Sequence, residues 1–370
     1  MSITPKNVLE IPELKSVLLI GGCGFLGLHL IEQFWNVSPR PDIHVFDIRG
    51  LPTISPTFYS FDPSKITVHV GDITSEEDIN KALAIAKPQV IVHSVSPVHG
   101  LGKEIYHKVN VEGTLNIIKQ AKRDENVRAL VYTSSAGVVF NGEDLKNADE
   151  EYPIPKVAMD AYNETKAIAE AHVLKAASEE DGKLRTVALR PAGIFGPGDR
   201  QMIPNIRAIA FRGQHKFQLG TNLNLFDFTY VGNVAYSHAL ATQKLFQEDS
   251  WKDINGQAFF ITNDSPIYFW SMARAVWKAD GFVDDPKFVI SRDFGIAIGY
   301  ISEFVSKLTG KEPGLTPFRV RTTCADKYYN ITKAKNLLQY APPTDLEQGI
   351  NLTLKWLDEI EAEKAQKKDK

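Results

Sequence analysis

The amino-acid sequence contains little cysteine, and none of its apolar stretches is long enough to cross a membrane. Its two cysteines, Cys23 and Cys324, are far apart and have no CxxC pair or histidine cluster beside them. This scarcity argues against a disulfide framework and against a zinc site, and it fits a reducing compartment. The first 15 residues carry prolines and acids where a signal peptide needs a continuous apolar core. We therefore expect no bound metal and a chain that begins in the cytosol.

An excess of basic charge is also absent. The chain has 42 Lys and Arg residues against 45 Asp and Glu residues, which gives a formal net charge of -3. Proteins that bind nucleic acid usually present a basic stripe, so nucleic acid is not an expected partner. With 43% apolar residues among 370, the chain can bury a large core and is expected to form a main domain and a smaller one.

Short apolar runs alternate with helical patterns from Ser16 to about Arg200. This alternation is typical of a doubly wound α/β domain, because a parallel sheet covered by helices buries its strands on both faces. The expected strands are SVLLI, IHVF, ITVHV, QVIVH, ALVYT and TVALR. We predict a Rossmann-like dinucleotide-binding domain over residues 1–200, with segments near 229–263 returning to its sheet. Residues 201–370 are predicted to form mainly a smaller substrate-binding lobe and C-terminal helices.

A glycine-rich turn, GGCGFLG, joins the first expected strand to the first expected helix. Gly21, Gly24 and Gly27 let the backbone turn tightly and approach a pyrophosphate, whose charge then lies on the free N–H groups at the helix start. A purely structural turn is the alternative, but the strand before it and the helix after it favour cofactor binding.

Two acidic residues follow later strands. Asp47 ends IHVF and can accept the hydroxyls of an adenosine ribose, which favours NAD, whereas Arg49 could instead receive the 2'-phosphate of NADP. Asp72, in VGDI, is placed either to meet the adenine amino group or to cap the helix that TSEED begins. The expected cofactor is therefore NAD(P)+, with NAD favoured.

A hydroxyl, a phenol and an ammonium are expected at one edge of the sheet. Ser134 and Ser135 end the strand ALVYT, and Tyr162 and Lys166 lie one turn apart on the next helix. A phenol is a poor base near neutral pH, so it needs a nearby cation to stabilise the phenolate. We predict that Ser135 holds a substrate oxygen while Tyr162, supported by Lys166, takes its proton.

Together these motifs resemble the extended short-chain dehydrogenase/reductases, and more narrowly the 3-beta-hydroxysteroid dehydrogenase family. The similar stretches are GGCGFLG, GDI, VNVEGT, YTSS, YNETK, RPAGIFGPGD and LTGKEPGLTPFRV, and one departure is Ile20, where many members have Thr. The resemblance implies a catalytic set of Ser135, Tyr162, Lys166 and Asn110, the last supporting a proton-relay water. It implies the following cofactor contacts: Gly21, Gly24, Phe25, Leu26, Gly27, Asp47, Asp72, Ile73, Ser134, Tyr162, Lys166, Pro191 and Ile194.

Within that family, the likeness extends to members that act on sterol carboxylates. It implies oxidation of a 3-beta-hydroxysterol 4-alpha-carboxylate to a 3-ketosteroid with loss of carbon dioxide, in sterol (ergosterol) biosynthesis. It also implies a sterol C-4 demethylation complex and a peripheral position on the cytosolic face of the endoplasmic reticulum membrane. Two alternatives stay open: a nucleotide-sugar epimerase or dehydratase, and a dinucleotide-binding sensor without turnover.

The second half of the chain leaves two structural questions. Phe211, Phe217, Leu225, Phe226, Phe228 and the run from Tyr268 either line an apolar cleft or, as we expect for most of them, form the core of the smaller lobe. Residues 294–308 have helical apolar spacing and are either an amphipathic helix at a membrane surface or a packed core helix. An epimerase would need cations for a diphosphate, for which Arg207, Arg212 and Lys216 are the candidates.

Overall fold

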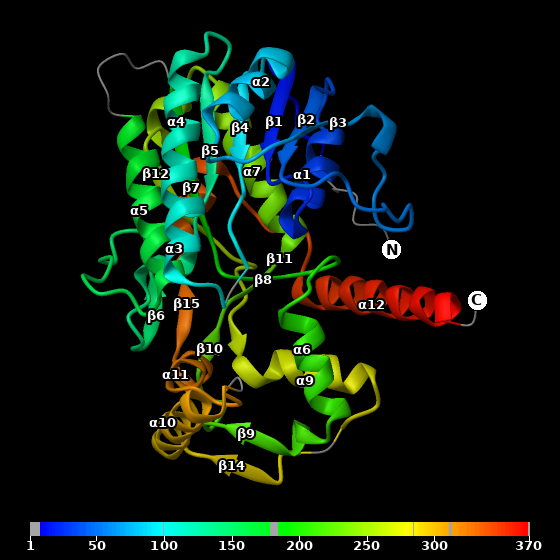
Figure 1. Cartoon of the computed structure of the whole chain (residues 1–370), viewed down its shortest axis with the longest axis vertical. Helices are drawn as coiled ribbons and strands as arrows, with labels where there is room; N and C mark the ends of the chain where they lie inside the picture. Colours follow the sequence, from blue (N-terminus) through cyan, green and yellow to red (C-terminus); the bar gives the residue numbers. More distant parts are fainter. Residues whose placement is uncertain (1–7, 99, 178–183, 284, 311–312, 369–370) are drawn as a thin grey trace.

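A parallel sheet covered by helices on both faces forms the larger part of the molecule (Figure 1). The computed structural model describes residues 8–98, 100–177, 184–283, 285–310 and 313–368. Within them, the sheet has the strand order β12-β7-β5-β4-β1-β2-β3, and every neighbouring pair is parallel. Its strands are β1 (Ser16–Ile20), β2 (Asp42–Asp47), β3 (Thr67–Val70), β4 (Val90–His93), β5 (Ala129–Thr133), β7 (Arg185–Pro191) and β12 (Gln257–Ile261).

The helices divide between the two faces of this sheet. One apolar core lies under α1 (Phe25–Trp35) and α7 (Val231–Phe246), and the other lies under α2 (Glu76–Ala86), α4 (Thr114–Arg123) and α5 (Ala161–Ala176). All residues of β1 and β5 are buried, as a strand covered on both sides requires. The predicted doubly wound α/β class is confirmed.

The order of the strands reverses between β1 and β4. Ile20 at the end of β1 pairs with Phe46 of β2 on one side and with His93 of β4 on the other. In open α/β sheets, ligands bind outside the carboxyl ends of the strands at such a switch point. The residues that follow β1, β4 and β5 therefore define the site.

The helical stretch predicted between Tyr106 and Lys122 is not uniformly α-helical. It consists of α3 (Lys103–Tyr106), a π-helical segment (His107–Gly113) and α4. Asn110 lies inside the π-helical segment. The π-helix is rare in proteins, and where it occurs it is often at a functional site.

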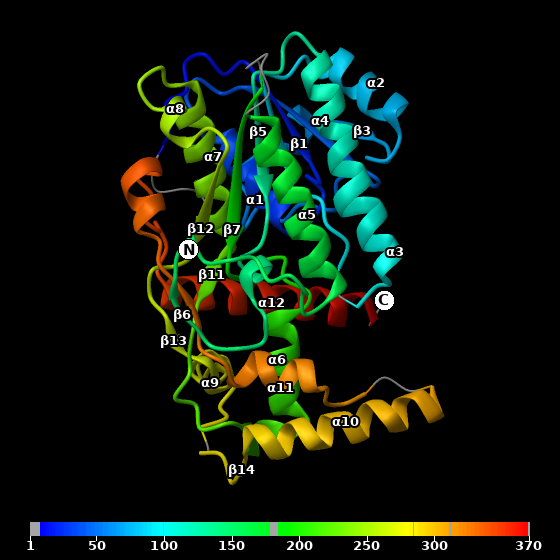
Figure 2. The same ribbon diagram turned by 90° about the vertical axis from the view of Figure 1, so that its left-hand side faces the viewer.

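The smaller lobe lies beyond the carboxyl ends of the large sheet (Figure 2). A second sheet has the order β13-β10-β15-β6, and short parallel pairs join β11 to β8 and β14 to β9. These strands are β6 (Leu145–Ala148), β8 (Gly193–Phe195), β9 (Phe217–Leu219), β10 (Leu225–Phe226), β11 (Phe228–Tyr230), β13 (Ile267–Tyr268), β14 (Phe288–Ile290) and β15 (Lys327–Tyr329). The remaining helices are α6 (Met202–Phe211), α8 (Trp251–Ile254), α9 (Phe269–Ala279), α10 (Arg292–Thr309), α11 (Pro317–Cys324) and α12 (Leu346–Lys368).

The chain passes between the two parts several times. From the second half, β12 and α7 join the large sheet and its covering helices, whereas β6, from the first half, pairs with β15 in the small sheet. Among the helices of the described residues, none is long and apolar enough to cross a membrane.

Candidate active site

The glycine-rich turn brings the backbone close to the first helix and to the end of β4. Gly21 has φ +88°, and a Cβ there would lie 3.0 Å from the Val95 nitrogen. A Cβ on Gly27 would lie 2.2 Å from the carbonyl oxygen of Gly21, so only glycine fits. Gly24 precedes the first residue of α1, and within the described chain no side chain caps that helix. Its first N–H groups therefore remain available to an anion such as a pyrophosphate.

Phe25 and Leu26, the first residues of α1, pack against the protein. The Phe25 ring lies against Gly198 and meets the ring of His29 edge-on, and Leu26 packs on the α1 core. His29 Nε2 is 2.7 Å from the carbonyl oxygen of Pro197, and burial lowers the pKa of His29 to about 4. A neutral imidazole therefore fixes α1 to the 196–198 turn.

Asp47 lies directly beside the glycine turn. Its carboxylate accepts hydrogen bonds from the Cys23 N–H at 3.1 Å and from the Arg49 N–H at 3.2 Å. The Arg49 guanidinium is largely exposed, with Nε 3.7 Å from the same carboxylate. Burial, followed by the negative charge of Asp47, raises the pKa of Cys23 to about 12, so this thiol stays protonated.

Asp72 and Ile73 form the turn that follows β3. Asp72 Oδ1 accepts hydrogen bonds from both the N–H and the hydroxyl of Thr74, at 2.9 Å each, while Ser75 caps α2. Ile73 is buried, and its side chain occupies the space beside Gly113. The alternative in which Asp72 itself caps the helix is therefore wrong, and its contact with an adenine stays a prediction.

Lys166 extends from α5 to the end of β5. Its ammonium donates a hydrogen bond to the Thr133 carbonyl and lies 4.2 Å from the centroid of the Tyr132 ring. The side chain is almost fully buried, and this burial lowers the pKa of Lys166 to about 7, although the charge of Glu170 acts in the opposite direction.

Tyr162 meets serine hydroxyls at the same edge. Burial raises the pKa of Tyr162 to about 12, and hydrogen bonding by Ser135 and Ser96 acts in the opposite direction. The ring of Tyr106 packs edge-on against it, with the centroids 5.9 Å apart. Burial is the largest influence on this pKa, and stabilisation of the phenolate by Lys166 stays a prediction.

Asn110 and Ser134 are held in the interior beside α5 and β7. Asn110 Nδ2 donates to the Thr165 hydroxyl at 3.0 Å, one residue before Lys166. Among the described residues, neither Asn110 Oδ1 nor the Ser134 hydroxyl has a hydrogen-bond partner, although both atoms are buried. Unsatisfied buried oxygens of this kind are free to bind a ligand or an ordered water.

The stretch after β7 borders the same edge. Pro191 ends β7 and pairs with Ile261, and Ile194 lies in β8 opposite Thr229 of β11. The Ser134 N–H donates to the Leu189 carbonyl at 2.7 Å, which aligns the end of β5 with β7.

The structure thus places the predicted residues that follow β1 and β5, and those that end β2 and β7, at one edge of the sheet, while Asp72 and Ile73 follow β3, its outer strand. Sequence reasoning missed Ser96, which follows β4 just as Ser135 follows β5 and could have been found by the same rule. It also missed Glu170 and Lys327, for which no local pattern gave a signal. Among the lobe aromatics, Phe226 and Phe228 are buried as expected, but the core prediction is wrong for Phe211 and Phe217, which are exposed.

Comparisons with known proteins show the family to which the chain belongs. Residues 18–292 match the model of the 3-beta hydroxysteroid dehydrogenase/isomerase family. The chain is 56% identical to the sterol-4-alpha-carboxylate 3-dehydrogenase, decarboxylating, of Saccharomyces cerevisiae, over 94% of this chain and 99% of that protein. Identity to the protein of the same description from Candida albicans is 58%, over 94% and 98%, and to that from Bos taurus 35%, over 94% and 93%.

Solved structures share the fold at much lower identity. A dTDP-glucose 4,6-dehydratase from Bacillus anthracis in complex with NAD matches with a TM-score of 0.67 and 17% identity, over 93% of this chain and 97% of that one. A UDP-glucose 4-epimerase from Thermotoga maritima matches with a TM-score of 0.69 and 18% identity, over 93% and 99%. These two likenesses show the fold alone, whereas the family match and the identity to the curated relatives show membership. The chain belongs to the 3-beta hydroxysteroid dehydrogenase/isomerase family.

Proposed function

We propose that this protein oxidises 3-beta-hydroxysterol 4-alpha-carboxylates to 3-ketosteroids with loss of carbon dioxide, using NAD(P)+ as hydride acceptor, in sterol biosynthesis. The observation that carries the proposal is the convergence of Ser135, Tyr162 and Lys166 at the end of β5, on the sheet edge where β1 leads into the glycine turn. Relatives described as decarboxylating sterol-4-alpha-carboxylate 3-dehydrogenases are 56% and 58% identical over 94% of this chain, which supports a sterol carboxylate as the substrate.

The residues at the switch point fit a dinucleotide. The backbone at Gly21 and Gly27 leaves no room for a side chain, and the uncapped start of α1 offers N–H groups to a pyrophosphate. When bound, the nicotinamide supplies the acceptor for the hydride that leaves C3 of the sterol.

The side chains of this protein move the proton. Ser135 holds the 3-hydroxyl oxygen, and Tyr162 takes its proton as the carbinol is oxidised. Because burial raises the pKa of Tyr162, forming the phenolate requires the positive charge of Lys166, whose own burial in turn makes that charge costly.

Decarboxylation follows from the chemistry of the product. Oxidation at C3 creates a beta-keto acid, in which the bond from C4 to the carboxyl carbon breaks and its electron pair moves toward the 3-oxygen as an enolate. Ser135 and Tyr162, which face that oxygen, stabilise the enolate until C4 takes up a proton. The chain need supply no further group for this step.

NAD is the proposed preferred cofactor. Asp47 lies where the ribose of the adenosine half is expected, and a carboxylate there accepts ribose hydroxyls and repels a 2'-phosphate. Arg49 is the group that would favour NADP, but its Nε lies 3.7 Å from the Asp47 carboxylate, which competes for its charge.

The epimerase alternative is weakened by Arg207, the first of its candidate diphosphate cations. The guanidinium forms a bidentate ion pair with Asp280, with oxygens 2.6 and 2.9 Å away, and a further pair with Asp358 at 2.8 Å. A cation already bound by two carboxylates is a poor partner for a sugar diphosphate.

We infer that the enzyme lies on the cytosolic face of the endoplasmic reticulum membrane, in a sterol C-4 demethylation complex, as the family resemblance implies.

The support in the structure is α10, because its small residues face the protein while its large apolar residues face solvent, the opposite of the usual arrangement in a surface helix. Its small residues Gly295 and Gly299 pack inward, the latter against Pro317, while Phe294, Phe304 and Leu308 are more than 60% exposed. In Figure 2, α10 lies at the end of the lobe farthest from the large sheet. A helix of this kind suits the headgroup region of a bilayer that holds the sterol.

Turnover of a 4-alpha-carboxysterol tests the main proposal. The purified protein is incubated with the sterol and with NAD+ or NADP+ separately, and the absorbance of reduced nicotinamide and the release of carbon dioxide are followed. One reduced cofactor for each carbon dioxide is expected. An epimerase would show no net cofactor reduction, and a sensor would bind cofactor without turnover.

A further inference from the structure

We propose that Lys327, which comes from the smaller lobe, binds the carboxylate of the substrate and thereby selects carboxylated sterols. The inference rests on the proposed function and adds to it a specificity-determining residue. It is carried by the position of the ammonium, by the groups that surround it, and by the chemistry of the sterol A ring.

Lys327 lies in β15, an inner strand of the small sheet. It pairs with Phe226 of β10 on one side and with Leu145 of β6 on the other. Two residues further on, the Tyr329 hydroxyl donates to the Ala136 carbonyl at 3.1 Å, directly after Ser135. The strand therefore reaches the residues that follow β5.

The ammonium lies between two aromatic rings that border the site. Lys327 Nζ is 4.6 Å from the ring centroid of Phe140 and 5.7 Å from that of Phe226. Phe140 ends the short turn that Ser135 caps, and Phe226 lies against Gly193, the residue before Ile194. Lys327 thus contacts one ring from the turn that the predicted substrate serine begins and one ring that packs on the stretch predicted to border the nicotinamide.

The positive charge is not neutralised by a direct contact. Within the described chain, no hydrogen bond or ion pair joins Lys327 Nζ to a carboxylate. The nearby Asp160 caps α5, and its oxygens accept from the N–H and the side-chain amide of Asn163 at 2.8 Å each. Burial lowers the pKa of Lys327 to about 8, and the charge of Asp160 acts in the opposite direction. Lys327 is half-buried, and a cation partly removed from water without a bound anion favours a negatively charged ligand.

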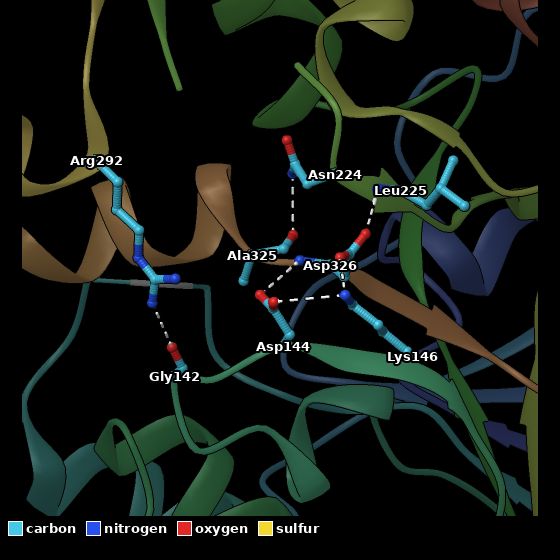
Figure 3. Close-up of polar contacts among 8 residues, drawn as sticks. All are labelled: Gly142, Asp144, Lys146, Asn224, Leu225, Arg292, Ala325 and Asp326. Atoms are coloured by element: carbon cyan, nitrogen blue, oxygen red, sulfur yellow. Dashed lines mark hydrogen bonds and ion pairs between the residues drawn. The ribbon is translucent and has the colours of Figure 1, made fainter. Parts of the chain in front are cut away.

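The residue before Lys327, Asp326, has partners of its own in the small sheet. Asp326 accepts from the Leu225 N–H at 2.7 Å and pairs with Lys146 of β6 at 3.2 Å (Figure 3). Figure 3 also shows that Arg292 reaches the Gly142 carbonyl from α10. Lys146 is largely exposed and already paired, so it serves as a matched control for Lys327.

The geometry of the substrate suits a cation at this place. The 4-alpha-carboxyl group is attached to the carbon next to C3, so its oxygens lie close to the hydroxyl that Ser135 and Tyr162 are proposed to hold. Asp160, which influences the pKa of both Lys327 and Tyr162, is two residues before Tyr162. A charge-assisted hydrogen bond from Lys327 would orient the carboxylate while C3 is oxidised.

Equilibrium binding separates this role from a structural one. Dissociation constants are measured in the presence of NADH, which prevents oxidation, for a 4-alpha-carboxysterol and for the same 3-beta-hydroxysterol without the carboxylate. Lys327→Met should weaken binding of the carboxylated sterol about 100-fold and that of the other sterol less than about threefold. Lys327→Arg should recover most of the loss, and Lys146→Met should change neither constant by more than about twofold.

Equal losses for both sterols, or no loss, in Lys327→Met would overturn the proposal. Failure of the proposed function gives a different result: the wild-type protein would bind the carboxylated sterol in a Lys327-dependent manner but would not oxidise it with NAD+ or NADP+. A wild-type protein that binds the two sterols equally would overturn the carboxylate site whatever its turnover.

Discussion

Arg190 of β7 and Glu170 of α5 form a buried bidentate ion pair, with Nε–Oε2 and Nη2–Oε1 distances of 2.9 and 2.6 Å. Both side chains are almost completely buried. The pair joins the helix that carries Tyr162 and Lys166 to the strand that leads into Pro191 and Ile194. It therefore fixes the proposed proton acceptor relative to the stretch that the family resemblance places beside the nicotinamide.

Glu170→Gln should destabilise the fold by about 3 kcal/mol, because it leaves the buried Arg190 cation without its counter-charge. Urea unfolding followed by circular dichroism measures this change. Glu164→Gln is the matched control, since Glu164 lies on the same helix in an exposed pair with Lys103 and should cost less than about 1 kcal/mol. Similar losses in the two variants would contradict the role given to the buried pair.

Asp47→Ala should reduce the preference for NAD over NADP by at least about tenfold, because two hydrogen bonds to the ribose and the repulsion of a 2'-phosphate are lost together. The ratio of kcat/KM for the two cofactors is the measurement. Asp42→Ala, at the exposed start of the same strand, should leave that ratio unchanged. An unchanged ratio in Asp47→Ala would argue against the ribose contact.

Lys166 should make stability rise with pH. Its pKa in the folded chain is about 7, below the usual 10.5, so between these values the unfolded chain binds more protons than the folded one. Stability from this group therefore increases from pH 7 toward pH 10, by at most about 1.4 kcal/mol per pH unit. Below pH 7 both states are protonated and the cost of burying the charge is complete.

Urea unfolding of the wild-type protein and Lys166→Met at pH 7, 8 and 9 tests this sign. The free energy of unfolding of the wild type should rise relative to that of the variant as pH increases. Lys327, whose lowered pKa acts in the same direction, is present in both proteins and cancels. Parallel pH curves would show that Lys166 is not a buried, weakly basic lysine.

Phe304→Asp combined with Leu308→Asp should reduce binding to phospholipid vesicles by at least about tenfold, because both changes put charge on the exposed apolar face of α10. Co-flotation with vesicles measures binding, and turnover of a detergent-dispersed sterol shows that the site is intact. Ile85→Asp, at an exposed position on α2 of the large domain, is the control. If the wild type, the double variant and Ile85→Asp all float with vesicles equally, α10 is not the surface that binds the membrane.

The sequence predicted the parts of this molecule that depend on local pattern. The expected SVLLI and ALVYT runs are β1 and β5, and FLGLHLIEQFW is α1, because buried parallel strands and amphipathic helices leave clear periodicities. The glycine turn also follows from local geometry, since Gly27 has no space for a side chain. These regions form the half of the site that is proposed to hold the cofactor.

Contacts between distant segments could not be predicted in this way. The pairing of β6 with β15 joins residues 145–148 to 327–329, and the partner of Lys166 is a main-chain carbonyl, which carries no residue-type signal. Periodicity also could not decide whether the apolar residues of α10 face inward. That outcome depends on Gly295 and Gly299, which allow close packing on their own side of the helix.

The transfer of a label from C3 of the sterol tests the central claim most directly. A 4-alpha-carboxysterol deuterated at C3 is incubated with NAD+ and with the wild-type protein or Tyr162→Phe, and deuterium is measured in the nicotinamide and in the sterol product. The wild type should place the deuterium on the nicotinamide and release one carbon dioxide for each label transferred. Tyr162→Phe should lose at least about 10³-fold in this rate while binding NAD+ within a few-fold of normal. Deuterium retained in the sterol product, or near-normal transfer by Tyr162→Phe, would contradict oxidation at C3 with Tyr162 as the proton acceptor.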